Sequence, residues 1–490
     1  MNADDAETPA LNGEDSNINT HSDISKSNEI LTNNNNQKSN SYSSALSSSN
    51  KNAKKDLVIK AYNLNYNYGT NKYYYVKLLN EKGNPCKNFK VRIYFKSKYY
   101  TLTTNNKGKA YLKLKLKPGI YPVNIKFMGD KTYNPCNITR TITTNGTYMY
   151  ASSPRLTPKT YYNYQVKIKD LNKLPIVGEY VSIKFGTKKV KVKTNNQGIA
   201  TFKIKVPKKS MKFYLTYSGK TSLSSSVKRY IYTFKNMPNQ NSIWVRGEDM
   251  YNINLNTLKK SNVKNIFLHT YALDVFGKNK VKNFIAKSNK YGIKVHLWMQ
   301  CFYNGDWINP LTCGQKYLNK IISRAKSYAK IPGLAGIHFD YLRFGGNAYE
   351  YKGATEKISS FTRDITNAIV EVNGGLILSA AIMPEKEDIY YYGQDPNTLG
   401  KYLDVLVPMV YIGNYHQTYK WIGTMTKYFK ANSDTAKVWI GLQTYKSDSN
   451  PVPVSVTKLA KQVNAAYDNG GDGIALFRLG LTNFYKIRTK

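Results

Sequence analysis

The spacing of apolar residues divides the chain into three regions of different character. Residues 1–55 contain almost no large apolar side chain and are rich in Ser, Asn, Asp and Lys, so they are predicted to form a disordered spacer. From about 56 to 237 apolar and polar residues alternate between frequent turn signals, which is typical of small β-sandwiches. From 238 to 490 short apolar runs alternate with amphipathic stretches, which is typical of strands alternating with helices.

The β-rich region repeats itself. The segment 75–85 (YVKLLNEKGNP) is echoed by 165–175 (QVKIKDLNKLP), and 104–110 (TNNKGKA) is echoed by 194–200 (TNNQGIA). In both copies Asn-Asn-x-Gly lies between two predicted strands, where Asn and Gly tolerate positive φ. Two sandwiches are therefore predicted, at 56–148 and 149–237. With KPGIY at 117–121 and FMGDKTY at 127–133, the first resembles the immunoglobulin-like repeats of adhesin-like surface proteins, including those of methanogenic archaea, and the resemblance implies a role in reach and attachment.

The C-terminal region contains eight short apolar runs that are separated by helix-like segments. The runs are residues 243–245, 265–269, 294–299, 336–341, 376–383, 405–411, 438–444 and 473–478. Eight strands with alternating helices in about 250 residues fit a (β/α)8 TIM barrel. A doubly wound sheet usually stops at five to seven strands. The predicted fold class is thus α/β, with a C-terminal TIM barrel at 238–490 after two all-β immunoglobulin-like sandwiches.

The chain is strongly basic. Its 73 Lys and Arg against 30 Asp and Glu give a formal net charge of +43, which attracts polyanions. Many lysines alternate with apolar residues, as in 113–117 and 189–193, a pattern of solvated sheet faces. Because no recognition helix, zinc spacing or RNA-binding aromatic signature is present, nucleic acid is disfavoured as a partner. An acidic cell-wall polysaccharide or an anionic membrane surface fits better.

Other features bear on location and cofactors. No apolar run reaches the roughly 18 to 20 residues that cross a bilayer, and the polar start is typical of a mature secreted protein whose leader has been removed, so we expect secretion or surface display. Cys86 with Cys136 and Cys301 with Cys313 could form local disulfides or remain buried thiols. No CxxC or HExxH spacing occurs, and neither a cofactor nor a metal is predicted.

One predicted barrel strand ends in charge. The run at 336–341 closes with Asp340 and Tyr341, and Arg343 follows. In a β/α barrel such groups at the carboxyl ends of strands face the pocket where chemistry is done. Glycoside hydrolysis requires two carboxyl groups, one to protonate the leaving oxygen and one to act as nucleophile or base. We predict Asp340 and Glu385, which follows the next strand, as this pair.

Several alternatives to this pair stay open. Rival second carboxylates follow the first, third and fifth strands: Glu248, Asp249, Asp306 and Asp395. Asp340 could instead be a structural carboxylate paired with Arg343 or Arg246. Asp404 and Asp472 precede their strands and are expected at the other end of the barrel.

The residues predicted to bind substrate lie at strand ends or point into the barrel. Aromatic rings there can stack on sugar faces, and basic or imidazole groups can bind sugar oxygens. They are Arg246, His269, His296, Trp298, His338, Tyr341, Arg343 and Tyr411. If His269, His296 and His338 converged, they could instead hold a metal ion.

Several blocks of this region resemble a known family. They are IWVRG at 243–247, YGIKVHLW at 291–298, GIHFDYLRF at 336–344, DVLVPMVY at 404–411 and GIALF at 473–477. In this order they resemble the glycoside-hydrolase-like barrels of cell-envelope proteins, which are related to a bacterial glycosidase of peptidoglycan strands. One branch of that family has two adjacent Asp where this chain has Asp340 and Tyr341, whereas another has the Asp-Tyr-x-Arg-Phe form found here. Barrels of the α-amylase type, with an Asp after strand four and a Glu after strand five, are a weaker parallel, and a family 18 chitinase is disfavoured because Leu342 replaces its catalytic Glu.

The function predicted from the sequence is a secreted or surface glycoside hydrolase acting on an envelope polysaccharide. The resemblance to methanogen surface proteins implies pseudomurein glycan as one candidate substrate. One alternative is an adhesin whose barrel binds glycan without cutting it. Another is a metal-dependent polysaccharide deacetylase or hydrolase. The oligomeric state is not predicted.

Overall fold

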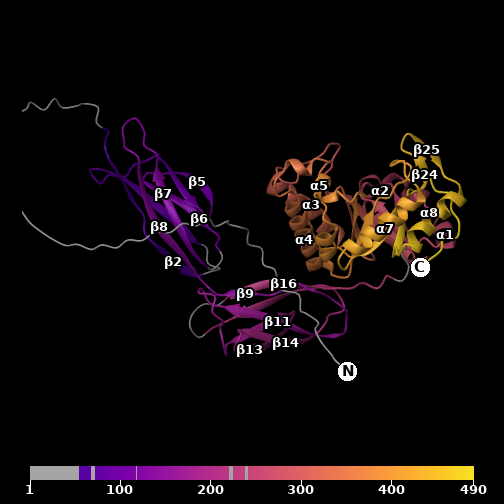
Figure 1. Ribbon diagram of the computed structural model, residues 1–490, viewed down its shortest axis with the longest axis horizontal. Helices are drawn as coiled ribbons and strands as arrows, with labels where there is room; N and C mark the ends of the chain where they lie inside the picture. The colour runs from indigo at the N-terminus through magenta and orange to yellow at the C-terminus, as the bar shows by residue number, and fades with distance from the viewer. Residues whose placement is uncertain (1–53, 68–71, 117–118, 220–224, 238–240, 490) are drawn as a thin grey trace, which may run out of the picture. The chain divides into compact units, whose positions relative to one another are not determined.

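A computed structural model describes residues 54–67, 72–116, 119–219, 225–237 and 241–489. The spacer predicted at 1–55 lies almost entirely outside these residues. Within them, strands fill the chain up to residue 233, and strands alternating with helices follow from residue 241 (Figure 1).

The first β-rich module consists of two sheets. One has the strand order β1-β3-β6, with bounds β1 Leu57–Lys60, β3 Lys72–Asn80 and β6 Lys109–Leu114. The other has the order β2-β8-β7-β4-β5, with bounds β2 Leu64–Asn67, β8 Cys136–Asn145, β7 Gly119–Phe127, β4 Lys90–Phe95 and β5 Lys98–Thr103. Alternate side chains of these strands point inward, as the period-two pattern predicts, and Val76, Ile93 and Ile125 are fully buried.

The second β-rich module repeats this topology. Its three-stranded sheet has the order β14-β11-β9, with bounds β14 Ile199–Lys205, β11 Tyr161–Lys169 and β9 Tyr148–Tyr150. Its five-stranded sheet has the order β10-β16-β15-β12-β13, with bounds β10 Arg155–Leu156, β16 Ser225–Thr233, β15 Met211–Tyr217, β12 Tyr180–Phe185 and β13 Lys188–Lys193. The internal repeat seen in the sequence is therefore a repeat of structure. The immunoglobulin-like class of the two modules stays a prediction.

The repeated Asn-Asn-x-Gly motif makes the same turn in both modules. Gly108 and Gly198 have φ of 67° and 73°, and a Cβ atom on either would lie 2.6 Å from a backbone oxygen. The side-chain oxygens of Asn105 and Asn195 each accept hydrogen bonds from two backbone N–H groups of the turn. The motif is retained because only Gly tolerates both the left-handed backbone and the close approach.

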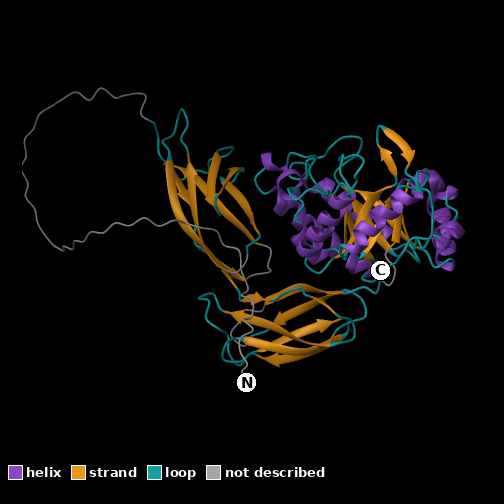
Figure 2. Cartoon of the chain, turned by 45° about the vertical axis from the view of Figure 1, so that its right-hand side comes forward, coloured by secondary structure: helices purple, strands orange, loops and turns teal. Residues whose placement is uncertain are grey.

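Residues 241–489 form a closed barrel of eight parallel strands, which confirms the predicted β/α barrel (Figure 2). The strands in barrel order are β17 Asn241–Val245, β18 Asn265–His269, β19 Lys294–Gln300, β20 Gly336–Asp340, β21 Ile377–Ile382, β22 Val405–Pro408, β23 Lys437–Gln443 and β26 Gly473–Phe477. Each contains or overlaps one of the eight predicted runs. The apolar runs are continuous because both faces of a barrel strand are buried.

Helices surround the strands, as Figure 2 shows in purple. They are η1 Gly247–Asn252, α1 Leu255–Lys260, α2 Tyr271–Lys290, α3 Gly314–Tyr328, η2 Ala348–Glu350, α4 Ala354–Asn373, α5 Asp388–Tyr392, α6 Pro396–Tyr402, α7 Tyr419–Asn432 and α8 Val456–Asp468. A two-stranded hairpin, β24 Tyr445–Ser447 with β25 Asn450–Pro453, follows β23. Within the described residues no helix combines the length and apolar character needed to cross a membrane.

The inside of the barrel is filled by large rings. Trp244, Phe267 and Trp439 are at most 1% exposed, and the imidazole of His338 stacks on the ring of Phe267 with centroids 4.0 Å apart. This packing closes the middle of the barrel, so open space for a ligand lies at its ends. All four cysteines are free thiols, so of the two readings given above the structure shows the unpaired one.

Candidate active site

A cavity of about 540 Å³ opens at the carboxyl ends of the barrel strands. The strands β18, β19, β20 and β26 supply residues to it, as do the loops that follow them and the hairpin. Its lining consists of Arg246, Glu248, His269, Tyr271, Trp298, Gln300, Asp340, Tyr341, Arg343, Met383, Met409, Tyr411, Asn414, Tyr415, Tyr445, Asp448 and Phe477. Six of the eight predicted substrate-binding residues and Asp340 are therefore gathered in one place.

Asp340 is the last residue of β20 and is 9% exposed. The indole N–H of Trp298 donates to Oδ2 at 2.9 Å, and the backbone N–H of Tyr341 donates to Oδ1 at 2.7 Å. Burial raises the pKa of Asp340 above its usual range, and these two donors with the nearby Arg343 charge only partly offset it. Among the described residues no Lys or Arg nitrogen lies within ion-pair distance of its carboxylate. The structural alternative, in which Asp340 is salt-bridged to Arg343 or Arg246, is thus not what is observed.

The backbone next to Asp340 is strained. Tyr341 has a φ of 51°, a left-handed conformation that aromatic residues seldom adopt. Its ring is held by stacking on Tyr303, with centroids 4.6 Å apart, and by edge contact with Trp307. Strain of this kind persists where the surroundings enforce it and is concentrated at functional sites.

Tyr411 lies near Asp340 with a hydroxyl that has no partner. Its side chain is 8% exposed and lines the cavity, and its oxygen makes no hydrogen bond within the described residues. Burial raises the pKa of Tyr411 well above its ordinary value, and the negative charge of Asp340 raises it further. A buried hydroxyl without a partner costs stability, so this group is suited to bind a ligand.

The positively charged guanidinium of Arg343 lies at the cavity and packs against aromatic rings. Its guanidinium lies 4.5 Å from the centroid of Trp307 and 5.1 Å from that of Tyr392. Burial lowers the pKa of this guanidinium. Its Nε is buried without a hydrogen-bond partner. The cavity therefore holds a preorganised cation that is suited to an acidic group of a ligand.

Glu385, the predicted second carboxylate, does not line the cavity. Its Oε1 accepts hydrogen bonds from Tyr415, at 2.9 Å, and from Tyr392, at 3.2 Å. Asp388 lies beside it, and burial followed by the charge of Glu385 raises the pKa of Asp388 to about 9. Tyr415 does line the cavity, so Glu385 is linked to the cavity only indirectly, through its hydrogen bond with that tyrosine.

The rival carboxylates have separate partners. Glu248 lines the cavity and is 3.3 Å from Arg246, which also pairs with Asp249 at 2.7 Å. Asp306 accepts from the N–H of Trp307, and Asp395 caps α6 through the N–H of Asn397. Of these four, Glu248 alone lines the cavity.

The three histidines proposed as metal ligands have different surroundings. His269 lines the cavity and packs its edge against Trp298. His338 is buried, accepts from the indole of Trp244 at 3.0 Å, and lies 2.9 Å from the Ser379 hydroxyl. His296 contacts Asn265, and burial lowers the pKa of His296 to about 3. Within the described residues no three His, Cys, Asp or Glu side chains are placed to hold a metal ion.

Sequence reasoning missed several lining residues. They come from the loop after β22 and from the hairpin after β23: Asn414, Tyr415, Tyr445 and Asp448. Both oxygens of Asp448 are engaged, one by the Tyr445 hydroxyl at 2.6 Å and one by the Asn414 amide at 2.8 Å. The run of residues 443–453 shows no pattern that predicts a hairpin folded over a strand end, so no sequence signal pointed to Asp448.

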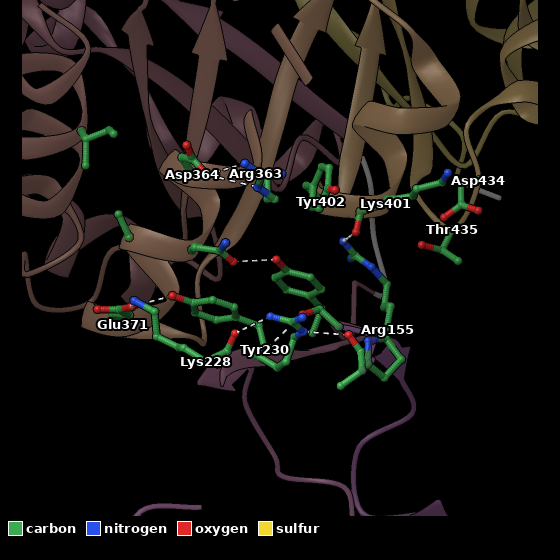
Figure 3. Close-up of a pocket in the computed structure, with 18 of the residues that line it drawn as sticks. Arg155, Lys228, Tyr230, Arg363, Asp364, Glu371, Lys401, Tyr402, Asp434 and Thr435 are labelled. Atoms are coloured by element: carbon green, nitrogen blue, oxygen red, sulfur yellow. Dashed lines mark hydrogen bonds and ion pairs between the residues drawn. The ribbon is translucent and has the colours of Figure 1, made fainter. Parts of the chain in front are cut away.

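A larger hollow, of about 1030 Å³, lies where the second β-rich module contacts α4 and α6 (Figure 3). Two of its acidic groups have close partners: Glu371 accepts from Lys228 at 2.8 Å and from Tyr230, and Asp364 pairs with Arg363 at 3.1 Å. Arg155 donates to Lys401 and Leu403 carbonyls and pairs with Asp404. These contacts join structural elements, so the smaller cavity around Asp340 is the better candidate for chemistry.

No family model and no curated protein matches the chain, so these two comparisons assign it to no family. Among solved structures, a chitinase from Rhizomucor miehei is 12% identical with a TM-score of 0.38 over 50% of this chain and 96% of its own. An endo-β-1,4-mannanase from Thermotoga petrophila is 12% identical with a TM-score of 0.38, over 49% and 68%. The spore cortex-lytic enzyme of Bacillus megaterium QM B1551 is 13% identical with a TM-score of 0.36, over 52% and 74%. Similarity at this level carries no argument, and the barrel assignment depends on the strand pairing described above.

Proposed function

We propose that the barrel hydrolyses glycosidic bonds of an acidic envelope polysaccharide, with Asp340 as the nucleophile or charge-stabilising carboxylate. The observation that carries this proposal is the placement of Asp340: a buried carboxylate at a strand end, oriented by Trp298 and the Tyr341 N–H, with no Lys or Arg of the described residues within ion-pair distance. We further propose that the chain acts outside the cell, where such a polymer lies.

The cavity suits the charge that develops during glycoside hydrolysis. The transition state is like an oxocarbenium ion, so positive charge appears at the anomeric carbon. A carboxylate that is already oriented and shielded from water stabilises that charge strongly. The unpartnered hydroxyl of Tyr411 can bind an oxygen of the substrate near the same carbon. Arg343 would bind an acidic group of the sugar, and Trp298 and Tyr341 offer ring faces to it.

Two residues are candidates for the second catalytic carboxyl group, one predicted from the sequence and one found in the structure. Glu385 is the residue predicted from the sequence, and here it supports Tyr415. Asp448 lines the cavity, and its charge raises the pKa of Tyr411, as that of Asp340 does. We favour Asp448 as the general acid because it lines the cavity and Glu385 does not, although a bound sugar oxygen would have to displace the Asn414 amide or the Tyr445 hydroxyl from it.

The variants Asp448→Asn and Glu385→Gln separate these candidates. Loss of the general acid slows cleavage of natural glycans but spares substrates with a good leaving group, such as aryl glycosides. We expect this split for Asp448→Asn. Loss of support for Tyr415 in Glu385→Gln should instead slow both substrates to a similar degree. The opposite assignment would follow if the split occurred in Glu385→Gln.

The hydrolase proposal is tested by incubating the purified chain with pseudomurein glycan, polygalacturonate and a neutral mannan and measuring new reducing ends. We expect release from an acidic glycan and none from the heat-inactivated control. If no glycan is cut although one is bound, the proposal of hydrolysis is wrong.

That outcome would favour the second candidate function, an adhesin that binds glycan without cutting it. One observation supports this alternative: among the carboxylates around Asp340, Asp448 is held by two hydrogen bonds and Glu248 by an ion pair. A barrel in which no carboxyl group can exchange a proton would still bind sugar through its rings.

A further inference from the structure

The outward face of one sheet in the first β-rich module carries a pair of exposed tyrosines. Tyr94 on β4 and Tyr99 on β5 are register partners, their ring centroids are 4.8 Å apart, and they are 41% and 69% exposed. Exposed rings gathered in one place on a protein surface commonly mark a site of interaction. Because the rings stand on paired strands, they form a rigid platform.

Two cations lie beside this platform. Arg92 precedes Tyr94 by two residues on the same face of β4, and its register partner on β7 is Lys126. Together with Thr101 and Met128 these side chains line a hollow of about 380 Å³. Neither Arg92 nor Lys126 makes an ion pair within the described residues, and the five strands of this sheet contain no Asp or Glu. The positive charge of the hollow is therefore available to an outside anion.

We propose that this face of the first module binds a carboxylated sugar unit of a polysaccharide, independently of the barrel. The Tyr94 and Tyr99 rings would stack on the apolar face of a pyranose. The Arg92 guanidinium would form a bidentate contact with the sugar carboxylate, and Lys126 would add a second charge. The Thr101 hydroxyl is placed at the same hollow to bind a ring hydroxyl. A hollow of this size is at the lower end of small-ligand sites, which fits one sugar unit of a longer chain.

The second module provides an internal comparison. Its strands β12, β13 and β15 have the same pairing, and the positions of Arg92, Tyr94, Tyr99, Thr101 and Lys126 are taken by Ser182, Lys184, Lys189, Lys191 and Thr216. That face is basic but lacks the aromatic pair. The combination of two rings and two cations at these positions is thus a property of the first module and does not follow from the repeated fold.

Nucleic acid is the other polyanion to consider. Proteins that bind single strands combine a groove of cations along the backbone with several stacking platforms for successive bases. The hollow offers one pair of rings and two cations, which suits a single sugar carboxylate better. The arrangement therefore favours an acidic glycan.

The test measures binding of the full-length chain to polygalacturonate by isothermal titration calorimetry at fixed salt. Partially methyl-esterified polygalacturonate and a single-stranded oligo(dT) are run beside it as probes of charge and of nucleic acid. The paired variants are Tyr94→Ala with Tyr99→Ala in the first module and Lys184→Ala with Lys189→Ala, at the equivalent positions, in the second. Each of the four side chains is exposed, so none of these changes removes a core contact.

We expect the tyrosine pair to weaken binding of polygalacturonate at least about tenfold, since anchor residues carry most of a binding free energy. The lysine pair should weaken it less than about threefold, and methyl esterification should weaken binding to the wild type. The proposal is overturned if both pairs lose affinity equally, if esterification has no effect, or if oligo(dT) binds as tightly as polygalacturonate.

A second variant keeps the test informative if the tyrosine double variant folds poorly. Arg92→Gln keeps both rings, removes one cation, and should lower affinity for polygalacturonate while leaving that for the esterified polymer nearly unchanged. Equal loss for the two polymers would contradict a carboxylate contact. All titrations are made in the Asp340→Asn background, so cleavage by the barrel does not contribute to the heat, and each proposal can fail alone.

Discussion

Buried carboxylates have different partners at the two ends of the barrel. At the starts of the strands, Asp404 is paired with Arg155 at 2.5 Å and Asp472 with Lys430 at 2.6 Å. At the carboxyl end, Asp340 is equally buried but receives only two uncharged hydrogen bonds. A cation beside a carboxylate serves stability, whereas a buried carboxylate left charged and unmatched costs stability. The difference supports the proposal that Asp340 serves chemistry, whereas the ion pairs of Asp404 and Asp472 serve the fold.

The pKa values show the same division. Burial tends to raise the pKa of Asp472, but the hydrogen bond from Lys430, the N–H of Val438 and the nearby lysine charges bring it below its usual range. Burial raises the pKa of Asp340, and its partners do not compensate. One carboxylate is thus stabilised in its charged form and the other is not.

The largest loss of stability is expected from Asp404→Asn. Asp404 and Arg155 are 7% and 5% exposed, and removing one member of a buried pair leaves the other charge unmatched, at a cost of roughly 3 kcal/mol. Guanidinium unfolding followed by tryptophan fluorescence measures it, because all five tryptophans lie in the barrel. Glycan cleavage by the folded variant should stay within about twofold of wild type. If Asp404→Asn instead lost most of its cleavage activity and kept its stability, Asp404 would serve chemistry, contrary to the comparison of the two barrel ends.

A smaller effect, on the rate of cleavage and not on stability, is expected from Tyr411→Phe. Removal of its unpartnered hydroxyl should leave stability unchanged or slightly higher, while the rate of cleavage falls by about tenfold, or roughly 1.4 kcal/mol of transition-state stabilisation. The matched control is Tyr467→Phe, because that hydroxyl is bonded to Asn241 away from the cavity. It should lose about 1 kcal/mol of stability and no activity. If both variants behave alike, Tyr411 has no role in substrate binding.

The smallest effect concerns the pH dependence of stability. Asp472 has a lowered pKa when folded, so its contribution is present above the unfolded pKa of about 4 and is lost as the pH falls through the folded value. Asp340 has a raised pKa, so the folded state loses stability as the pH rises from about 4 through its folded value. At pH 7, Asp472→Asn should melt lower than wild type, and Asp340→Asn should be equal or more stable by roughly 0.5 kcal/mol. The Asp340 difference should vanish below about pH 3, where its carboxyl is protonated in both states, and the Asp472 difference should shrink as the pH falls through its lowered folded pKa; thermal melts at a series of pH values would check both.

Much of the barrel and part of its site could be predicted from the sequence. Strands buried on both faces give short continuous apolar runs, and a strand that ends in charge, as at Asp340, shows where the cavity lies. The side chain of Glu385 was harder to place because the short helix α5 after it, and the contacts with Tyr392 and Tyr415, set its direction. Asp448 could not be predicted because its position depends on how the hairpin folds over the end of β23.

The β-rich modules show a similar limit. The Asn-Asn-x-Gly turns around Gly108 and Gly198 were predictable because one backbone conformation requires them. The tyrosine platform was not, because Tyr94 and Tyr99 meet only through the register of β4 with β5. In a chain with 43 tyrosines the sequence alone does not distinguish a platform from scattered surface rings.

The most direct test of the central claim is the rate at which Asp340→Asn releases reducing ends from the acidic glycan that the wild type cleaves. The account predicts a fall of at least about a thousandfold with substrate binding and stability retained, since the asparagine keeps the shape but not the charge that stabilises the transition state. A variant that cleaves within tenfold of wild type would contradict the claim that Asp340 performs the chemistry.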